Sequence, residues 1–492
     1  MTSCTTILVG KKASYDGSTM IARNDDCPNK TFILRNLEIN DPKNIKKEYK
    51  SKMSNITIAP EDIPENPLKH SYFPLVEQKG LIIEGVWAAG GINSKNVAVS
   101  ATETITTNER VLGGDPLIDL KNNEGKYGLG EEDFAILLLP YINSAREGIK
   151  RLGMLLEKYG TYESNGIAIS DENEIWWLET IGGHHYIAKK VPDDKVVIMP
   201  NRFGLDEFDL EDAFGKQENH ICSPDLREFI KDNKLKLNKE ENVFNPRLAF
   251  GSHTDFDHIY DTPRHWFLGR YLCKKQYKWD GPNADFNPES DDIPWAVTPD
   301  NLVTVEDVKY LLSSHFQGTK YDPYSKGNED TKFKYRVIGI QRTDHLHCCQ
   351  IRGYMPNDLK SILWFTYGAN TFNTFVPLFN NVNKFPDYFK NNTEKVDTNS
   401  FYWQNRLIGA LADSQFNSCI PHIERYQIET VGNAYNILNK YDKEYKETNV
   451  EMLEKANQEI ADMIKEKTDY TLDKVLYEVS MKMKTVYNRN DN

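Results

Sequence analysis

The hydrophobic positions near the beginning of the chain predict two short strands joined by a tight turn. The apolar run at residues 7–9 is typical of a strand, and residues 19–22 form a second one. Between them, residues 14–18 contain an Asp-Gly pair, which tolerates the positive φ of a hairpin turn. A hairpin brings its two ends together, so we expect residues 23–26 to return to the neighbourhood of Cys4.

A helical pattern follows between residues 131 and 159. The segment is divided near Pro140, and Ser144 is a suitable N-cap for its second half. Gly160 marks the expected end of the helix. Apolar residues line one face of the second half, which is typical of an amphipathic helix: Ile149, Leu152, Leu155 and Leu156.

Further strands are predicted on both sides of this helical segment. Two precede it, at residues 81–89 and 97–103. Four follow it as an antiparallel meander, at residues 166–170, 174–179, 185–188 and 195–199. Strands, then helices, then strands indicate an α+β fold with two antiparallel sheets covered by helices. Residues 401–492 are helix-rich and charged, and we expect them to pack on the sheets as a helical appendix.

Composition and charge narrow the class of protein. The 492 residues are 39% hydrophobic, which is ample for a large core, and the formal net charge is −13. No run of 18 apolar residues is present, so we expect no membrane span, and the negative charge argues against a nucleic-acid partner. The seven cysteines are irregularly spaced and no secretory signal is visible, so we expect a cytoplasmic protein without a disulfide framework.

Cys4 is the residue with the most distinctive chemistry. Three residues precede it, so their removal would make it the first residue of the chain. Its α-amino group, with a reference pKa of about 8, could then take the proton of its own thiol. We expect Arg23 beside the sulfur, where it favours the nucleophilic thiolate, and Asp26 could orient the amine. Thr5 and Thr6 are second choices, because a hydroxyl is a weaker nucleophile than a thiol.

A second cluster, at residues 345–349, contains four side chains of types that bind metals. Residues 344–351 are predicted to form a strand, and alternation then puts His345 and His347 on one face. Cys348 and Cys349 point to opposite faces, and no second ligand pair with zinc spacing follows. We therefore expect no metal site here.

The hairpin and several later segments resemble a known family. The segments Cys4-Thr5-Thr6, Asp16-Gly17-Ser18 and Ala22-Arg23-Asn24-Asp25-Asp26 are similar to the N-terminal signature of the N-terminal nucleophile hydrolases. With residues 99–104, 176–185, 200–203 and 263–266, they resemble more closely the cysteine dipeptidases of Lactobacillus-type bacteria, peptidase family C69. These blocks lie between residues 4 and 390, so the resemblance covers most of the chain.

The resemblance has implications for fold and mechanism. It implies a four-layer αββα sandwich over residues 4–400, preceded by a propeptide at residues 1–3 and followed by the helical extension 401–492. It also implies that Cys4 attacks the amide bond of a dipeptide, that Asn201 donates to the oxyanion, and that Arg264 lies near the nucleophile. No metal or organic cofactor is implied. We expect small peptides as substrates and a homo-oligomeric assembly.

One position departs from the related penicillin V acylases and bile salt hydrolases. These relatives carry an asparagine where Glu103 is aligned, so the identity of a second oxyanion donor stays open. We interpret Glu103 instead as an acidic contact for the free α-ammonium group of a dipeptide, a charge that acylase substrates lack. Two alternatives remain: an acylase for N-acylated small molecules, and a secernin-like interaction protein without peptidase activity.

Overall fold

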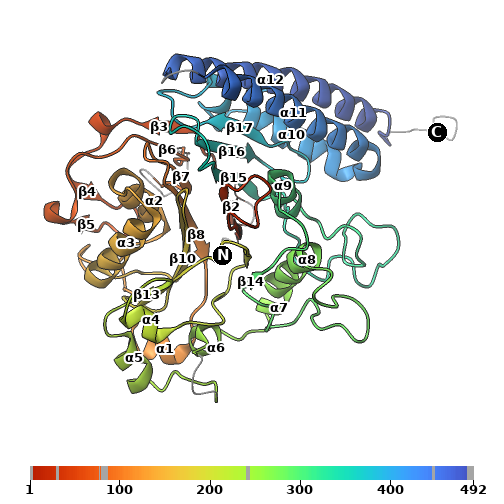
Figure 1. Cartoon of the computed structure of the whole chain (residues 1–492). Helices are drawn as coiled ribbons and strands as arrows, with labels where there is room; N and C mark the ends of the chain where they lie inside the picture. The colour runs from red at the N-terminus through yellow and green to blue at the C-terminus, as the bar shows by residue number, and fades with distance from the viewer. Residues whose placement is uncertain are drawn as a thin grey trace.

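The first strand begins directly after Cys4 and lies inside an antiparallel sheet near the centre of the molecule (Figure 1). The computed structural model describes residues 4–28, 31, 33–76, 78, 87–239, 244–445 and 449–484. The predicted propeptide, residues 1–3, and most of the predicted strand 81–89 lie outside the described residues. Within the described ranges, no helix is both long enough and apolar enough to cross a bilayer.

The predicted hairpin is confirmed and forms the middle of a seven-stranded sheet. Thr6 is paired with Arg23, and the second strand continues past residue 22 to Asp26. All neighbouring strands in this sheet are antiparallel. Their order across the sheet is β14 (Ala296–Val297), β12 (Val196–Met199), β1 (Thr5–Val9), β2 (Thr19–Asp26), β15 (Thr343–Ile351), β16 (Ser361–Tyr367) and β17 (Val376–Phe379).

A six-stranded antiparallel sheet packs against the first one, because β2 contacts two of its strands, β8 and β9. Its order is β13 (His220–Cys222), β11 (Tyr186–Lys190), β10 (Ile175–Thr180), β9 (Asn165–Ser170), β8 (Ala98–Thr104) and β7 (Gly90–Ile92). Two small strand pairs accompany the sheets: β3 (Glu38–Asn40) with β6 (His70–Tyr72), and β4 (Tyr49–Lys50) with β5 (Thr57–Ile58). Because the six-stranded and seven-stranded sheets pack on each other, the side chains between them are shielded from water on both sides.

The predicted four-stranded meander is wrong in its last strand. β9, β10 and β11 are consecutive neighbours in the six-stranded sheet, but β12 leaves it and pairs with β1. All four residues of β12 are buried, which suits a strand covered on both faces inside the larger sheet. Met199 lies opposite Thr6, so this crossing brings Pro200 and Asn201 to the end of the sheet where Cys4 lies.

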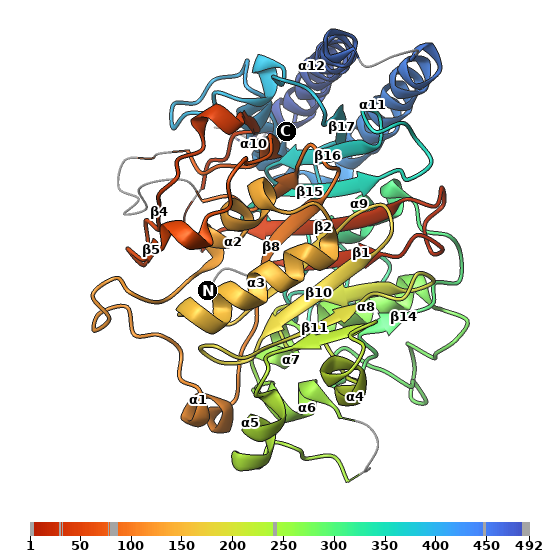
Figure 2. The ribbon, with the colours of Figure 1, turned by 60° about the vertical axis from the view of Figure 1, so that its left-hand side comes forward.

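The helical segment 131–159 is confirmed, with its predicted division. It consists of α2 (Glu131–Leu138), the 3₁₀ turn η3 (Leu139–Tyr141) and α3 (Ala145–Tyr159). Ser144 caps α3 by accepting from the backbone N–H of Glu147 at 3.2 Å, and Gly160 ends it with a φ of 65°. The apolar faces of α2 and α3 share a core with Ile167, Trp176 and Leu178 of the six-stranded sheet, and Figure 2 shows α3 in front of β10, which it contacts.

Two helices cover the seven-stranded sheet next to β1 and β2. These are α8 (Thr262–Leu272) and α9 (Val305–Leu312). Asn24 of β2 donates to the backbone oxygen of Leu312 at 2.8 Å, and Arg264 of α8 donates to Thr5 at 2.7 Å. The remaining helices before the C-terminal region are short: α1 (Glu109–Gly114), α4 (Leu210–Phe214), α5 (Leu226–Asp232), α6 (Pro246–Phe250), α7 (Asp257–Tyr260), η1 (Pro42–Asn44), η2 (Pro60–Asp62) and η4 (Asp387–Phe389).

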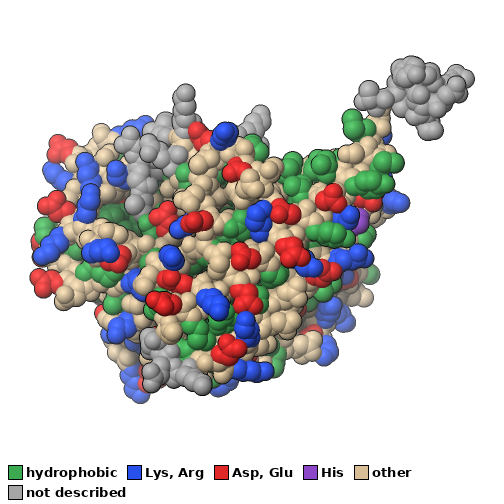
Figure 3. Space-filling view, turned by 90° about the horizontal axis from the view of Figure 1, so that it is seen from above, with side chains coloured by type: hydrophobic (Ala, Val, Ile, Leu, Met, Phe, Trp, Pro, Cys, Tyr) green, Lys and Arg blue, Asp and Glu red, His purple; other side chains and the backbone are tan. Residues whose placement is uncertain are grey.

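The C-terminal region is helical, as predicted, and packs on the outer strands of the seven-stranded sheet. It consists of α10 (Phe401–Ser414), α11 (Phe416–Glu444) and α12 (Val450–Ser480), which contact β16 and β17 (Figure 1). Asn457 of α12 bonds the backbone of Phe379 through both its donor and its acceptor, each at 2.9 Å. Seen from above, this side of the molecule carries acidic and basic side chains interspersed (Figure 3).

Candidate active site

The sulfur of Cys4 lies in the interior, between the two sheets. Cys4 directly precedes β1 and is 1% exposed. Because Thr6 is opposite Arg23, alternation along both strands points the side chains of Cys4, Thr6 and Arg23 to the same face. Nη1 of Arg23 lies 3.1 Å from the Cys4 sulfur. The structure thus brings together the two residues that the hairpin pattern placed side by side.

Arg23 is held by backbone groups of the opposite sheet. Nη1 also donates to the carbonyl oxygen of Thr102 at 2.8 Å, and Nη2 donates to those of Ala101 at 2.9 Å and Ala89 at 3.1 Å. Its side chain is buried. Several fixed acceptors leave the guanidinium one position, so its positive charge stays against the sulfur.

Asp25 belongs to the same cluster, although sequence reasoning gave it no role. Its Oδ1 lies 3.9 Å from the Cys4 sulfur and 3.3 Å from Nη1 of Arg23, and its Oδ2 accepts from Nε of Arg35 at 2.7 Å. Burial alone would raise the pKa of Asp25, but Arg35 and Arg23 hold it well below its usual range. Alternation along β2 could have indicated this position, since residue 25 shares the face of residue 23.

Asp26 points to the other face of β2. Its Oδ1 accepts from the hydroxyl of Thr343 at 2.6 Å, and its Oδ2 is paired with Arg336. No contact of this carboxylate with the Cys4 sulfur is found among the described residues. A role for Asp26 in orienting the α-amine therefore remains a prediction.

Arg264 and Asn201 form a second group, on the α8 side of Cys4. Nη1 of Arg264 donates to the backbone oxygen of Cys4 and to Thr5, whereas Nη2 donates to Oδ1 of Asn201 at 2.8 Å and to Asp261 at 2.7 Å. Nδ2 of Asn201 donates to the carbonyl oxygen of Thr104 at 3.0 Å. An amide nitrogen carries two N–H groups, so one donor of Asn201 is not used by that bond.

Glu103 enters from β8 and is fully buried. Its Oε2 accepts from the hydroxyl of Thr6 at 2.6 Å, whereas its Oε1 has no hydrogen-bond partner among the described residues. Burial raises the pKa of Glu103 to about 8, although Arg264 and Thr6 favour its ionised form. A buried carboxylate with one unpartnered oxygen can accept a donor from a ligand.

The neighbours of Cys4 act on its thiol in opposite directions. Burial raises the pKa of Cys4 well above its usual value, and Arg23 is the group that opposes this effect. Glu103 and Asp25 raise it further. In the chain as described, Arg23 is therefore the group that supports a thiolate at this position.

The burial of Glu103 predicts a pH-dependent difference in stability. Its folded-state pKa of about 8 exceeds its ordinary value of 4.5, so this group stabilises the fold fully below pH 4.5 and loses that contribution as the pH rises to about 8. Between these limits, the unfolding free energy of the natural chain should fall by about 1.4 kcal/mol per pH unit more steeply than that of Glu103→Gln. Urea unfolding at pH 5.5 and 7.5 measures this, and parallel pH profiles would contradict it.

His345 and His347 lie on one face of β15, as alternation predicted, and both are buried. Their rings are bonded to each other, with Nε2 of His345 3.1 Å from Nδ1 of His347. In the part of the chain that the structure describes, no group of three or more His, Cys, Asp or Glu side chains is arranged to hold a metal ion.

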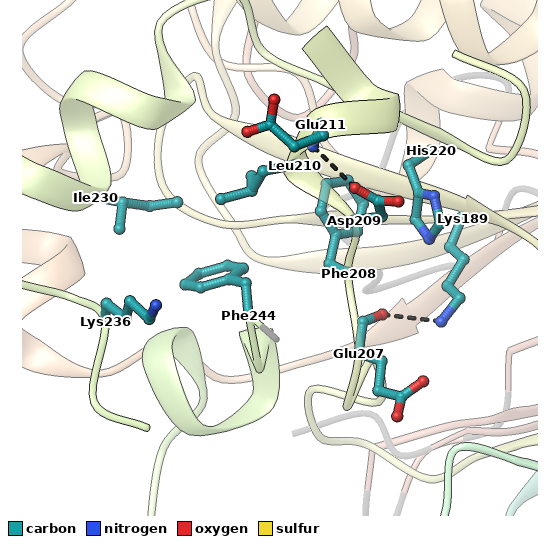
Figure 4. A pocket seen from close by; sticks show the side chains of 10 residues that line it. All are labelled: Lys189, Glu207, Phe208, Asp209, Leu210, Glu211, His220, Ile230, Lys236 and Phe244. Atoms are coloured by element: carbon teal, nitrogen blue, oxygen red, sulfur yellow. Dashed lines mark hydrogen bonds between the residues drawn. The ribbon is translucent and has the colours of Figure 1, made fainter. Parts of the chain in front are cut away.

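A cavity of about 500 Å³ lies elsewhere, on the side of the six-stranded sheet near β11 and β13 (Figure 4). Figure 4 shows Lys189 in its wall, where Nζ donates to the backbone oxygen of Glu207 at 2.9 Å. The lining includes none of the residues described around Cys4. Its wall combines charged side chains of both signs with Phe208 and Phe244. Because none of the residues around Cys4 belongs to this wall, the cavity does not mark the site of the cysteine chemistry.

Comparison with known proteins gives matches along the chain. A family model described as Peptidase family C69 matches residues 3–429. A protein named dipeptidase from Bifidobacterium longum is 47% identical, over 99% of this chain and 100% of that protein. A probable dipeptidase A from Streptococcus pyogenes is 45% identical over 99% of this chain and 100% of its own length. Dipeptidase A from Lactobacillus helveticus is 40% identical over 94% of each chain.

Proposed function

The chain belongs to peptidase family C69 and is a peptidase, and we propose that it hydrolyses dipeptides with the thiol of Cys4 as nucleophile. The observation that carries this proposal is the 3.1 Å contact between Arg23 and the Cys4 sulfur, in a site where burial otherwise disfavours the thiolate. The names of the relatives support the choice of dipeptides as substrates.

The proposed reaction requires a free α-amino group on Cys4. Removal of residues 1–3 provides it, and this amine takes the thiol proton. The thiolate attacks the carbonyl carbon of the dipeptide, and the tetrahedral intermediate collapses to a thioester as the departing amine of the substrate takes the proton from the α-ammonium group of Cys4. Water, deprotonated by the α-amine of Cys4, then attacks the thioester. The carboxylic acid leaves, and the sulfur takes the proton from that α-ammonium group, which restores the thiol. Arg264, which bonds the backbone oxygen of Cys4, would keep this residue in place through both steps.

The layer order and domain limits form a finer proposal about the fold. We infer a four-layer αββα arrangement over residues 4–400, with 401–492 as a helical extension packed on it. The packing of α2 and α3 on one sheet supports this order, as does that of α8 and α9 on the other. The extension is supported by the contacts of α10, α11 and α12 with β16 and β17.

Asn201 is proposed to stabilise the oxyanion through the N–H of its side chain that Thr104 does not use. Asn201→Asp should lower kcat by about 10²–10³-fold with KM within a few-fold, because one oxyanion donor is worth about 3–4 kcal/mol of barrier. The aspartate can still accept from Arg264, so one of the two bonds that hold the side chain survives, whereas the bond to the carbonyl oxygen of Thr104 is lost. Steady-state kinetics of the variant, with its melting temperature as control, measure the effect. A variant that keeps kcat would exclude Asn201 as the donor.

Glu103 is proposed to bind the α-ammonium group of the substrate through Oε1. Glu103→Gln keeps the acceptor for Thr6 but removes the charge, so KM for dipeptides should rise about 10–100-fold, the effect of a hydrogen bond to a charged group. Because the pKa of Glu103 is raised to about 8 in the empty site, KM of the natural enzyme should also fall as the pH rises from 6 to 8. An unchanged KM in Glu103→Gln would refute this role.

The substrate class is tested by direct competition between the alternatives. Hydrolysis of dipeptides containing Ala, Leu or Gly is compared with that of penicillin V and glycine-conjugated bile acids. We expect turnover of the dipeptides. Preferential turnover of the acylated compounds would identify an acylase, and no turnover of either class by a correctly processed protein would favour an interaction protein.

A further inference from the structure

A series of buried polar side chains runs from the Cys4 site to the facing sheet. In the register of the sheet, His345 of β15 lies opposite Asp25 of β2, and His347 lies opposite Arg23. Nδ1 of His345 lies 3.5 Å from Oδ2 of Asp25 without forming a hydrogen bond, and it has no other hydrogen-bond partner among the described residues. Nε2 of His345 is bonded to Nδ1 of His347 at 3.1 Å. The other ring nitrogen of His347, Nε2, is 2.9 Å from Oγ of Ser100 on the facing sheet.

With neutral rings, one arrangement of protons avoids placing a ring lone pair against the Asp25 carboxylate. The Asp25 carboxylate is ionised and can only accept, so Nδ1 of His345 carries the proton that faces it. Nε2 of His345 then accepts from Nδ1 of His347, and Nε2 of His347 accepts from the hydroxyl of Ser100. The N–H and O–H groups of these three side chains, His345, His347 and Ser100, therefore all point in the direction of Asp25.

The surroundings keep both rings in place and neutral. The ring of Phe73 packs on them, with centroid distances of 4.8 Å to His345 and 5.6 Å to His347. A Cβ at Gly90 would lie 3.0 Å from Nε2 of His347 and 2.7 Å from the backbone oxygen of Val99, so the absence of a side chain there permits this close packing. Burial lowers the pKa of His345 well below its usual value and that of His347 to about 3.

We infer that His345, oriented by His347 and Ser100, is a positioning residue that fixes the Asp25 carboxylate and thereby keeps Arg23 against the Cys4 sulfur. Asp25 shares Nη1 of Arg23 with that sulfur. If Asp25 loses the N–H dipole that His345 directs at it from 3.5 Å, its charge is balanced by the arginines alone, and it draws Arg23 away from Cys4. This inference rests on the proposed function of Cys4, and it concerns neither a metal ligand nor a general base.

The test measures the reactivity of the thiol as well as catalysis. In the mature enzyme, the rate of Cys4 alkylation by iodoacetamide is followed against pH by peptide mass spectrometry. The titratable and charged groups acting on Cys4 in the mature enzyme are its own α-amine, Arg23, Asp25, Glu103 and Glu131, and those acting on His345 are Asp25, His347, Arg35 and Arg23. All of these are unchanged in the variants except the substituted histidine itself.

Two substitutions of His345 separate hydrogen bonding from volume. His345→Leu removes the ring N–H that faces Asp25. It should move the alkylation midpoint upward by about half to one pH unit and lower kcat about tenfold, with KM within twofold. His345→Asn offers an amide N–H near the position of Nδ1, and should restore both values to within about threefold of the natural enzyme. A folded His345→Leu with an unchanged midpoint and kcat would overturn the inference.

Ser100→Ala keeps the inference testable if His345→Leu does not fold. It removes only the last donor of the series, and should shift the midpoint in the same direction and lower kcat about threefold. Ser170→Ala is the matched control, because Ser170 is a buried serine of the same sheet whose hydroxyl has no partner among the described residues. Equal behaviour of the two serine variants would overturn the inference. Activity retained by Cys4→Ala would instead refute the proposed function, whereas the alkylation midpoints of the His345 and Ser100 variants would still test whether His345 positions Asp25 and Arg23.

Discussion

Cys4→Ala is expected to abolish dipeptide hydrolysis, with kcat reduced by about 10⁴-fold or more, and to leave the fold intact. No other sulfur or hydroxyl group can take over, because the α-amine and Arg23 would act on an atom that is no longer present. The fold should tolerate the change, since Arg23 keeps Asp25 and the backbone oxygens of Thr102, Ala101 and Ala89 as acceptors.

Two further variants control this experiment. Cys4→Ser should retain only a trace of turnover, because a hydroxyl is far less ionised than a thiol near neutral pH. Cys419→Ala, in the buried cluster between α10, α11 and α12, should retain full activity. Initial rates with a dipeptide and thermal unfolding of each variant give the comparison. Measurable turnover by Cys4→Ala above that of a blank preparation would rule out Cys4 as the nucleophile.

Arg23→Met is expected to have the second largest effect, on both activity and stability. Without the guanidinium, burial and the nearby carboxylates raise the pKa of Cys4 unopposed, so we expect kcat/KM to fall about 10³-fold. The unfolding free energy should fall by about 3–5 kcal/mol, the cost of removing one partner of a buried ion pair. Three buried carbonyl oxygens also lose their donor.

Arg23→Lys separates charge from geometry. The lysine keeps a positive charge but lacks the fork that reaches the sulfur and the carbonyl oxygens together. Its alkylation midpoint should therefore lie between those of the natural enzyme and Arg23→Met. If Arg23→Met folded and showed the same midpoint as the natural enzyme, Arg23 would not be the group that stabilises the thiolate.

Local signals in the sequence were sufficient for the hairpin and for α2 and α3. Asp16-Gly17, Ser144 and Gly160 act within a few residues of themselves, so their effects can be predicted without knowledge of the fold. The assignment of β12 to a sheet was not predictable in this way. An apolar run of four residues indicates a buried strand but carries no information about its neighbour.

The site shows the same division between local and distant information. The proximity of Cys4 and Arg23 followed from the hairpin, whereas Asp25 required attention to strand alternation, which puts Asp26 on the opposite face. Arg35 and His345 join the cluster only through tertiary packing, 10 and 320 positions from Asp25. Such contacts leave no pattern within a short stretch of sequence.

Identification of the acylated residue during turnover tests the central claim most directly. The purified enzyme is mixed with a dipeptide, quenched in acid, digested and examined by mass spectrometry. If Cys4 is the nucleophile and residues 1–3 are removed, the acyl group lies on Cys4 in a peptide whose first residue is Cys4. An acyl group on another cysteine, or full activity in protein that still begins at Thr2, would contradict the proposed mechanism.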